Sequence, residues 1–166
     1  MIVYQRSPDY LAADIDRAVA IELRTVVQFW WRNFAPRHFT ERGAQIYRYE
    51  RRSAEYMKRK QRVKRHQNPL EFSGLSKQMA LGSITIQGSG DSIGRGGKRR
   101  LAANEARGMM PVPRYFFQFK TTKPIRKQEE LTRLAPAEGG VLARVLHQRS
   151  LDRLEMMKIP ETVSIE

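Results

Sequence analysis

Residues 7–36 read SPDYLAADIDRAVAIELRTVVQFWWRNFAP, and this stretch decides much of the fold. Ser7 suits an N-cap, Pro8 the first helical position and Asp9 the first turn, while Pro36 ends the pattern. The spacing predicts a helix of about 25 residues, or about 38 Å, whose apolar face packs into the core. The apolar residues at helical spacing are Leu11, Ile15, Val19, Leu23, Val26, Trp30 and Phe34.

The stretch that follows, residues 37–65, concentrates positive charge and interleaves it with tyrosine. Like charges three or four residues apart on a helix repel one another. Guanidinium groups, by contrast, fork onto phosphates or carboxylates, and tyrosines are enriched in interfaces. We therefore favour a contact surface over a solvated helix face, the other interpretation of such a run.

Within this stretch, Ser53 predicts the start of a surface helix that runs to about Arg65, with few apolar positions. The cations expected to contact a partner or DNA are Arg48, Arg51, Arg52, Lys58, Arg59, Lys60, Arg62, Lys64 and Arg65, and the expected aromatic contacts are Tyr47, Tyr49 and Tyr56.

In the second half of the chain, the spacing of the apolar residues changes from a helical to a strand pattern. Residues 80–87 alternate and contain β-branched side chains, which predicts a strand, and 114–120 is the strongest strand pattern. Residues 100–107 fit a strand or a short helix equally well. A final helix is expected from about residue 135, with a face marked by Leu142, Val145, Leu146, Arg149 and Leu154. Between the predicted strands we expect a flexible loop at 88–98, whose glycines are Gly88, Gly90, Gly94, Gly96 and Gly97.

Together these patterns predict a single α+β domain over residues 1–157, followed by an extended tail at 158–166. In it, a long N-terminal helix and a C-terminal helix pack on a small antiparallel β-sheet. The basic helix lies on the surface, and the remaining connections are extended loops.

Composition narrows the classes of function. The chain has 166 residues, with 31 Lys and Arg against 17 Asp and Glu, a formal net charge of +14. Such an excess attracts polyanions or acidic protein surfaces, including the acidic face of a neighbouring copy in a symmetric assembly. There is no cysteine, no signal-peptide pattern and no apolar run that could span a membrane. We therefore expect synthesis in the cytosol and no membrane partner.

No pattern indicates catalysis, a metal site or a small-molecule substrate. The glycines of the loop form G-x-G-x-x-x-G, one residue longer than the dinucleotide fingerprint, and no phosphate-loop pattern is present. His38, His66 and His147 lack the short spacings of a metal site, and the latter two are expected to be exposed. The expectation is a protein that is not an enzyme and binds no cofactor.

Four segments, taken in order, resemble a family of tailed-bacteriophage virion proteins, the neck and tail-completion (virion morphogenesis) proteins. They are HFTERGAQIYRY at 38–49, RSAEYMKRK at 52–60, NPLEFSG at 68–74 and PVPRYF at 111–116. The likeness covers residues 8–155, without the glycine loop or the tail.

The resemblance implies a structural protein of the virion, assembled in the host cytoplasm, that docks onto other proteins around the DNA conduit. It implies a ring of six-fold or twelve-fold symmetry at the head–tail junction or tail end. Other neck and tail proteins would be its partners, with genomic DNA in the channel as a further one. The alternative from composition is a free nucleic-acid-binding protein, either a regulator or a processing factor.

Overall fold

The computed structural model describes residues 8–71, 74–89, 91–93, 99–102, 104–113 and 127–157. The described chain is mostly helical with a small antiparallel β component, in agreement with the α+β prediction. Its residues group into two compact units, each described by itself below. Unit 1 comprises Met1–Val27, Gln87–Arg107 and Val141–Glu166, and unit 2 comprises Gln28–Ile86 and Gly108–Gly140.

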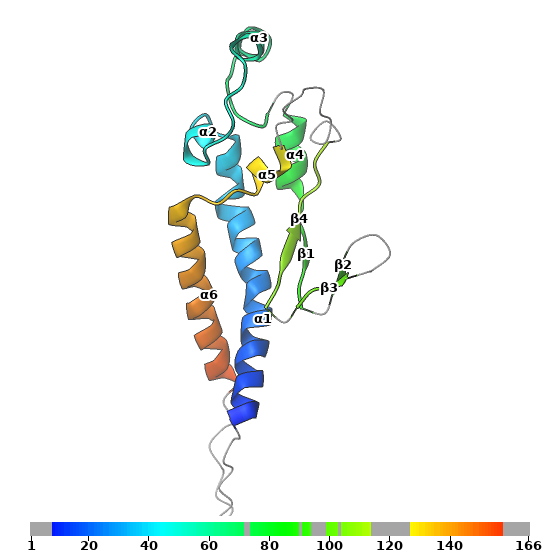
Figure 1. Ribbon diagram of the computed structural model, residues 1–166, viewed down its shortest axis with the longest axis vertical. Helices are drawn as coiled ribbons and strands as arrows, with labels where there is room; N and C mark the ends of the chain where they lie inside the picture. Colours follow the sequence, from blue (N-terminus) through cyan, green and yellow to red (C-terminus); the bar gives the residue numbers. More distant parts are fainter. Residues whose placement is uncertain are drawn as a thin grey trace, which may run out of the picture. The chain divides into compact units, whose positions relative to one another are not determined.

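The first helix, α1, spans Pro8–Asn33, close to the predicted bounds. A 3₁₀ helix, η1 (Ala35–Phe39), follows it and includes Pro36, because proline lacks the N–H that the α-helical ladder needs. The short helix α2 (Gly43–Ile46) was not predicted. The basic helix α3 spans Ala54–Lys64, and the predicted start at Ser53 is confirmed. These elements are drawn in Figure 1 in blue to green.

The predicted strand at 80–87 is wrong in its first part. Residues up to Gly82 belong to helix α4 (Leu75–Gly82), and strand β1 is confined to Thr85–Gln87. Gln78, Met79, Ala80 and Leu81 all favour helix, and this local preference extends through the start of the alternating pattern.

The remaining strands are short. β1 pairs with β4 (Arg107–Met109), and β2 (Ser92–Ile93) pairs antiparallel with β3 (Arg99–Arg100). The undecided stretch 100–107 therefore begins and ends in strand residues. The strand predicted at 114–120 and the tail at 158–166 lie outside the described residues.

Two helices close the described chain. α5 (Lys127–Leu131) was not predicted, whereas α6 (Pro136–Met156) confirms the predicted final helix. Of the face predicted for α6, the four aliphatic side chains are half-buried, and Arg149 is exposed. Glu138 accepts a hydrogen bond from the Ala135 N–H at 3.1 Å and so caps the start of α6.

The apolar core of unit 2 lies around Phe39, Leu70, Ala80 and Leu131, with Tyr49 packed against it. Gly43 is needed close by, since a Cβ at this position would lie 2.8 Å from the Arg37 carbonyl oxygen and 2.9 Å from that of His38. Both atoms belong to the backbone, so a side chain at residue 43 would require η1 to move.

In unit 1 the helices α1 and α6 are joined through polar side chains rather than through an apolar core. On α1 the buried residues are Asp14, Ala18 and Glu22, at successive intervals of four residues. Glu22 accepts a 2.6 Å hydrogen bond from Arg153 of α6, so the two helices, side by side in Figure 1, are joined by an ion pair. The predicted apolar stripe of α1 is half-buried at Val19 and Leu23 and exposed at Ile15.

Candidate functional site

Helix α3 carries most of the cations that the sequence singles out, and its ends are set by local signals. At the N-terminus, the Ser53 hydroxyl accepts a hydrogen bond from the Tyr56 N–H at 3.2 Å, the usual N-cap interaction. At the C-terminus, Arg65 adopts a left-handed conformation with φ 56°, and its N–H donates to Gln61 at 2.9 Å. Glu55 in the first turn and Arg62 in the last complement the helix dipole.

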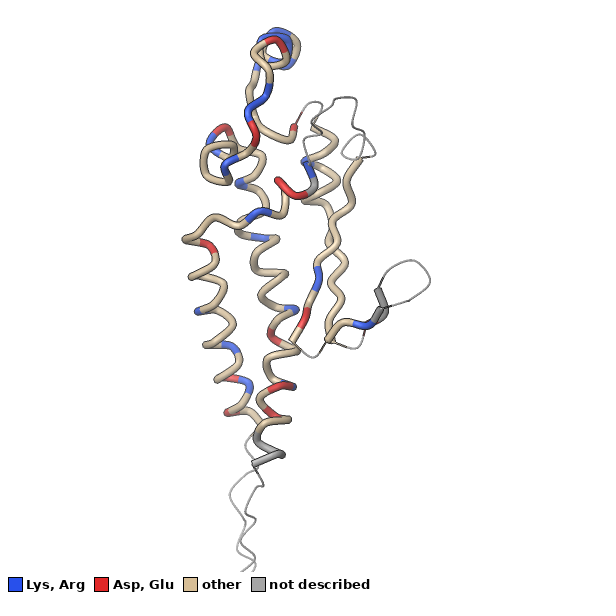
Figure 2. The backbone as a smooth tube through the Cα atoms, in the orientation of Figure 1, with Lys and Arg blue, Asp and Glu red and all other residues tan. Residues whose placement is uncertain are grey.

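The cations of α3 divide between two faces of the helix. Met57, Lys60 and Lys64 lie on the less exposed face, and Lys60 retains only 2% exposure. At 100° per residue, the opposite side carries an exposed set that we call the outward face of α3. Figure 2 shows the concentration of Lys and Arg on this helix. The outward face consists of Glu55, Lys58, Arg59, Arg62 and Arg65.

Two of the three predicted aromatic contacts are packed into the interior of unit 2. Tyr47 is 1% exposed and stacks on His38, with ring centroids 3.6 Å apart and planes at 11°. Its hydroxyl donates to Glu138 at 2.6 Å. Tyr49 is half-buried, and its hydroxyl hydrogen-bonds His38 Nδ1. Tyr56, in contrast, remains 37% exposed.

Burial controls the ionisation of this aromatic cluster. Desolvation lowers the pKa of His38 from 6.5 to about 4, although the backbone of Glu130 favours the charged ring. Desolvation likewise raises the pKa of Tyr47, reinforced by the Glu138 carboxylate, and that of Tyr49, reinforced by Glu130. At neutral pH the imidazole and both phenols are therefore uncharged.

Arg52 is also used within unit 2. Its guanidinium forms a bidentate pair with Glu130, donating to Oε1 at 3.1 Å and also to Oε2. Glu130 is only 2% exposed and accepts a further bond from the Glu50 N–H at 2.9 Å. Arg52 therefore joins the segment before α3 to α5, and its charge is neutralised there.

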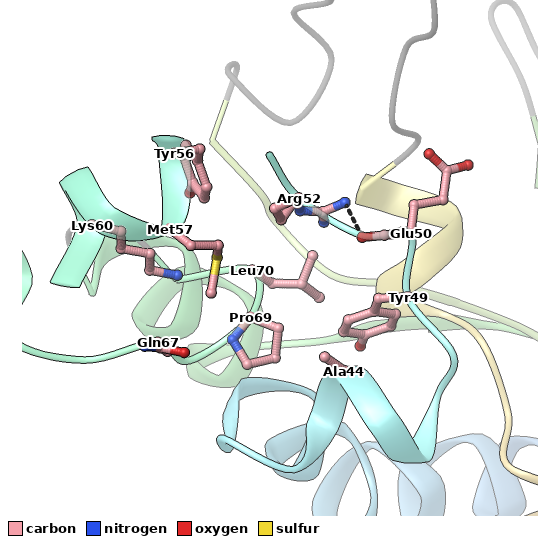
Figure 3. A pocket seen from close by; sticks show the side chains of 10 residues that line it. All are labelled: Ala44, Tyr49, Glu50, Arg52, Tyr56, Met57, Lys60, Gln67, Pro69 and Leu70. Atoms are coloured by element: carbon pink, nitrogen blue, oxygen red, sulfur yellow. Dashed lines mark hydrogen bonds between the residues drawn. The ribbon is translucent and has the colours of Figure 1, made fainter. Parts of the chain in front are cut away.

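Lys60 points toward a small pocket between α3 and the loop after it, with a cavity volume of about 60 Å³ (Figure 3). Its ammonium donates to the Asn68 carbonyl, and desolvation lowers the pKa of Lys60 to about 8. The pocket lining combines Tyr49, Met57 and Leu70 with the Arg52 side chain. A cavity of this size holds a water molecule or two, far less than ligand sites of about 300 Å³ or more.

The start of the predicted glycine loop is held in unit 1. Gly88 N–H donates to Asp91 Oδ2 at 2.7 Å, and the same oxygen accepts from Arg24 at 2.9 Å. A Cβ on Gly88 would lie 2.1 Å from Arg24 Nε, so a side chain at residue 88 would displace the Arg24 side chain from this position. Gly90, Gly94, Gly96 and Gly97 lie outside the described residues.

The most important residues that the sequence analysis missed are Glu130 and Glu138, the two buried acids that hold Arg52 and Tyr47. The position of Glu138, three residues after the start of a predicted helix, was an available signal for a capping role. Glu130 had none, since its partner is 78 residues away.

Among the other predicted contacts, Arg48 and Arg51 are exposed, Arg48 with a positive φ of 51°. His147 is exposed as expected, while His66 is half-buried. Within the described residues no group of three or more His, Asp or Glu could hold a metal ion, and no helix is long and apolar enough to cross a membrane. No protein-family model, curated protein or solved structure matches the chain.

Proposed function

We propose that this protein is a structural virion protein of a tailed phage, a ring-forming subunit at the head–tail junction or tail end. It acts by docking onto other copies and onto neighbouring neck or tail proteins around the DNA conduit, and catalyses no reaction. We retain within this proposal the arrangement expected from the sequence, in which the first and last helices pack on a small antiparallel sheet.

The observation that carries the proposal is the inverted burial in unit 1. Asp14, Glu22 and Ser150 are buried there, whereas large apolar side chains remain exposed. A chain that folds for itself alone normally buries its aliphatic residues first. The exposed apolar residues on α1 and α6 are Ile15 at 49%, Ile21 at 39%, Leu151 at 43% and Met156 at 81%.

Association of copies would give these side chains the burial that the chain does not. Fully burying one Leu or Ile side chain is worth about 1.5–3 kcal/mol, so several in one interface contribute substantially to assembly. Closed rings also arise naturally when one patch meets a different patch on the next copy. The resemblance to the neck and tail-completion proteins supports the same assembly, with a second copy as the first partner.

Protein identification on purified virions tests the proposal directly. We expect several copies of the protein in each mature particle. We also expect a phage that lacks its gene to accumulate unjoined heads and tails. A protein absent from purified particles, or a deletion phage with normal particles, would contradict the proposal.

The second candidate function, a free nucleic-acid-binding protein, is favoured by one specific observation: the outward face of α3 is cationic and unburied. The two functions separate in a phage carrying Lys58→Gln, Arg59→Gln, Arg62→Gln and Arg65→Gln together. A virion role predicts defective particles, whereas a free regulator predicts normal particles with lost DNA retardation.

A further inference from the structure

The outward face of α3 holds cations that pair with no acid among the described residues. Three described arginines have acid partners: Arg24 pairs with Asp91, Arg52 with Glu130 and Arg153 with Glu22. By contrast, Lys58, Arg59 and Arg62 form no ion pair with any described residue, and Arg65 none either. Four like charges lie close together here with Glu55 as the one acid of the face, so the face attracts negative charge.

The make-up of the face distinguishes phosphate from an acidic protein surface. Protein interfaces have an apolar centre with charged residues depleted from it, whereas nucleic-acid interfaces are polar and strongly cationic. On α3 the exposed apolar residues are Tyr56 and Val63, at 37% and 54%, and helical spacing places both at one edge of the outward face. The outward face itself is formed by charged residues, four cations and Glu55.

The aromatic residues decide between single and double strands. Single-stranded nucleic acid is bound by stacking bases on exposed aromatic rings. Tyr47 is buried against His38, and Tyr49 packs into the core, so neither offers a ring to a base. Tyr56 is two-thirds covered and lies 5.9 Å from the Lys60 ammonium. The helix therefore offers one partly exposed ring rather than a row of rings for successive bases, which favours a duplex over a single strand.

The spacing of the cations fits a phosphate backbone. Lys58, Arg62 and Arg65 follow one another at four and three residues, so they span about 10 Å of helix at about 1.5 Å per residue. One DNA strand places a phosphate about every 3.4 Å of helix axis, so cations spread over about 10 Å can reach more than one phosphate. The outward face has no Asn, Gln or small apolar residue with which to read adenine or a thymine methyl group, whereas its arginines suit both phosphate and guanine, so a test needs more than one base sequence.

We infer that the outward face of α3 binds the sugar–phosphate backbone of duplex DNA without regard to base sequence. This deepens, and rests on, the contact role proposed above for a protein placed around a DNA conduit. The inward anchoring of α3 through the Ser53 cap and the Lys60 bond to Asn68 holds the cations in place.

The test measures binding of the full-length protein to fluorescent duplexes of about 20 base pairs, in two unrelated sequences, between 50 and 200 mM salt. The face variant carries Lys58→Gln, Arg59→Gln, Arg62→Gln and Arg65→Gln. The control carries Arg32→Gln, Lys77→Gln, Arg107→Gln and Arg144→Gln, all exposed and outside this face. Each variant removes four charges, so both have a formal net charge of +10, from +14.

We expect the face variant to lose at least about tenfold in affinity and to reduce the salt slope by about 3–4, since each phosphate contact contributes about 0.9. The control should change the slope by less than about 1. Equal loss in both variants would overturn the inference, because net charge alone would then explain binding. Circular dichroism confirms that the face variant keeps its helix content, which Gln is expected to preserve.

Three further arms address the ligand. Tighter binding to single strands than to duplex, or more than about tenfold preference between the two sequences, would overturn the inference. Competition by polyglutamate as effective as by duplex of equal charge would also overturn it. Failure of the proposed function is separately visible: a protein that binds duplex as expected but is absent from virions keeps this inference and loses the other.

Discussion

At the scale of single residues, His38 shows how a titratable side chain becomes a structural one. It is fully buried, stacked on Tyr47 and hydrogen-bonded to Tyr49, and its pKa falls from 6.5 to about 4. Between pH 4 and pH 6.5, His38 is therefore protonated in the unfolded chain and neutral in the folded chain. Stability must decrease as the pH falls from 6.5 toward 4.

We expect this group to cost up to about 3 kcal/mol of unfolding free energy at pH 4 relative to pH 7, at about 1.4 kcal/mol per pKa unit. Urea unfolding between pH 7 and pH 4 measures it. His38→Phe keeps a ring beside Tyr47 and should flatten this part of the profile. His147→Gln, at an exposed position, should leave the profile unchanged. An equally steep loss in His38→Phe would show that carboxylates alone account for the acid sensitivity.

Glu130 presents the complementary case of a buried acid with partners. It accepts from Arg52 through both carboxylate oxygens and from the Glu50 N–H. Glu130→Gln keeps the shape but leaves a guanidinium with 17% exposure without its counter-charge. Removing one partner of a buried pair costs about 3–5 kcal/mol. We expect a loss of about 3 kcal/mol in unfolding free energy.

Chemical denaturation of Glu130→Gln beside Glu155→Gln provides the comparison, because Glu155 is exposed on α6 and the charge change is the same. A loss below about 1 kcal/mol in Glu130→Gln, of the size typical of exposed pairs, would mean that the pair is solvated in solution.

At the scale of elements, glycines differ in whether the surrounding structure leaves room for a side chain. Gly139 and Gly140 lie in the second turn of α6, where an added Cβ would meet nothing within 4 Å. Gly43 lies beneath two backbone carbonyls of η1. Glycine inside a helix costs about 1 kcal/mol relative to alanine, so only the first pair should respond favourably to substitution.

We therefore expect Gly139→Ala with Gly140→Ala to raise the unfolding free energy by about 1–2 kcal/mol, and Gly43→Ala to lower it by about 2 kcal/mol or more. Thermal unfolding of the two variants measures both changes. Stabilisation by Gly43→Ala would show that the Arg37 and His38 carbonyls yield easily, contrary to the packing described.

The contrast among elements also shows what the sequence could predict. α1, α3 and α6 follow from caps, breakers and periodicity, which are local. The outward cations of α3 follow as well, since helical spacing separates them. The internal roles of Arg52 and Tyr47 do not follow, because their partners Glu130 and Glu138 lie far away in sequence. The role of Lys60 does not follow either, because its partner is the backbone carbonyl of Asn68, which no side-chain pattern marks. Such long-range pairings need the fold.

The same limit explains α1. Periodicity identifies its apolar stripe but not what covers it, and in unit 1 the buried residues of α1 are Asp14, Ala18 and Glu22. A polar seam of this kind is stabilised by the Glu22–Arg153 pair and by α6, while the stripe keeps exposed positions. Apolar patterning predicts that a face will be buried somewhere, in the chain or in an assembly.

At the scale of the whole molecule, exposed apolar residues and unpaired cations suit an assembly better than a solitary chain. Copies brought together would present several α3 helices to one duplex. Linked binding of this kind raises apparent affinity by about 10²–10⁴ when the geometry allows simultaneous contact. Oligomerisation and DNA affinity should therefore be coupled in this protein.

Ile15→Glu combined with Leu151→Glu should break that coupling. We expect the mass measured by light scattering to fall toward that of one chain, because two exposed apolar positions of unit 1 become charged. Apparent duplex affinity should fall at least about tenfold although α3 is untouched. The near-UV dichroism of the His38–Tyr47 stack should persist, since it belongs to unit 2.

The matched control, Ile46→Glu with Leu75→Glu, changes two exposed apolar positions of unit 2 and should retain the wild-type mass. A wild-type protein that stays monomeric at high concentration, or a control that dissociates equally, would contradict the assembly through unit 1.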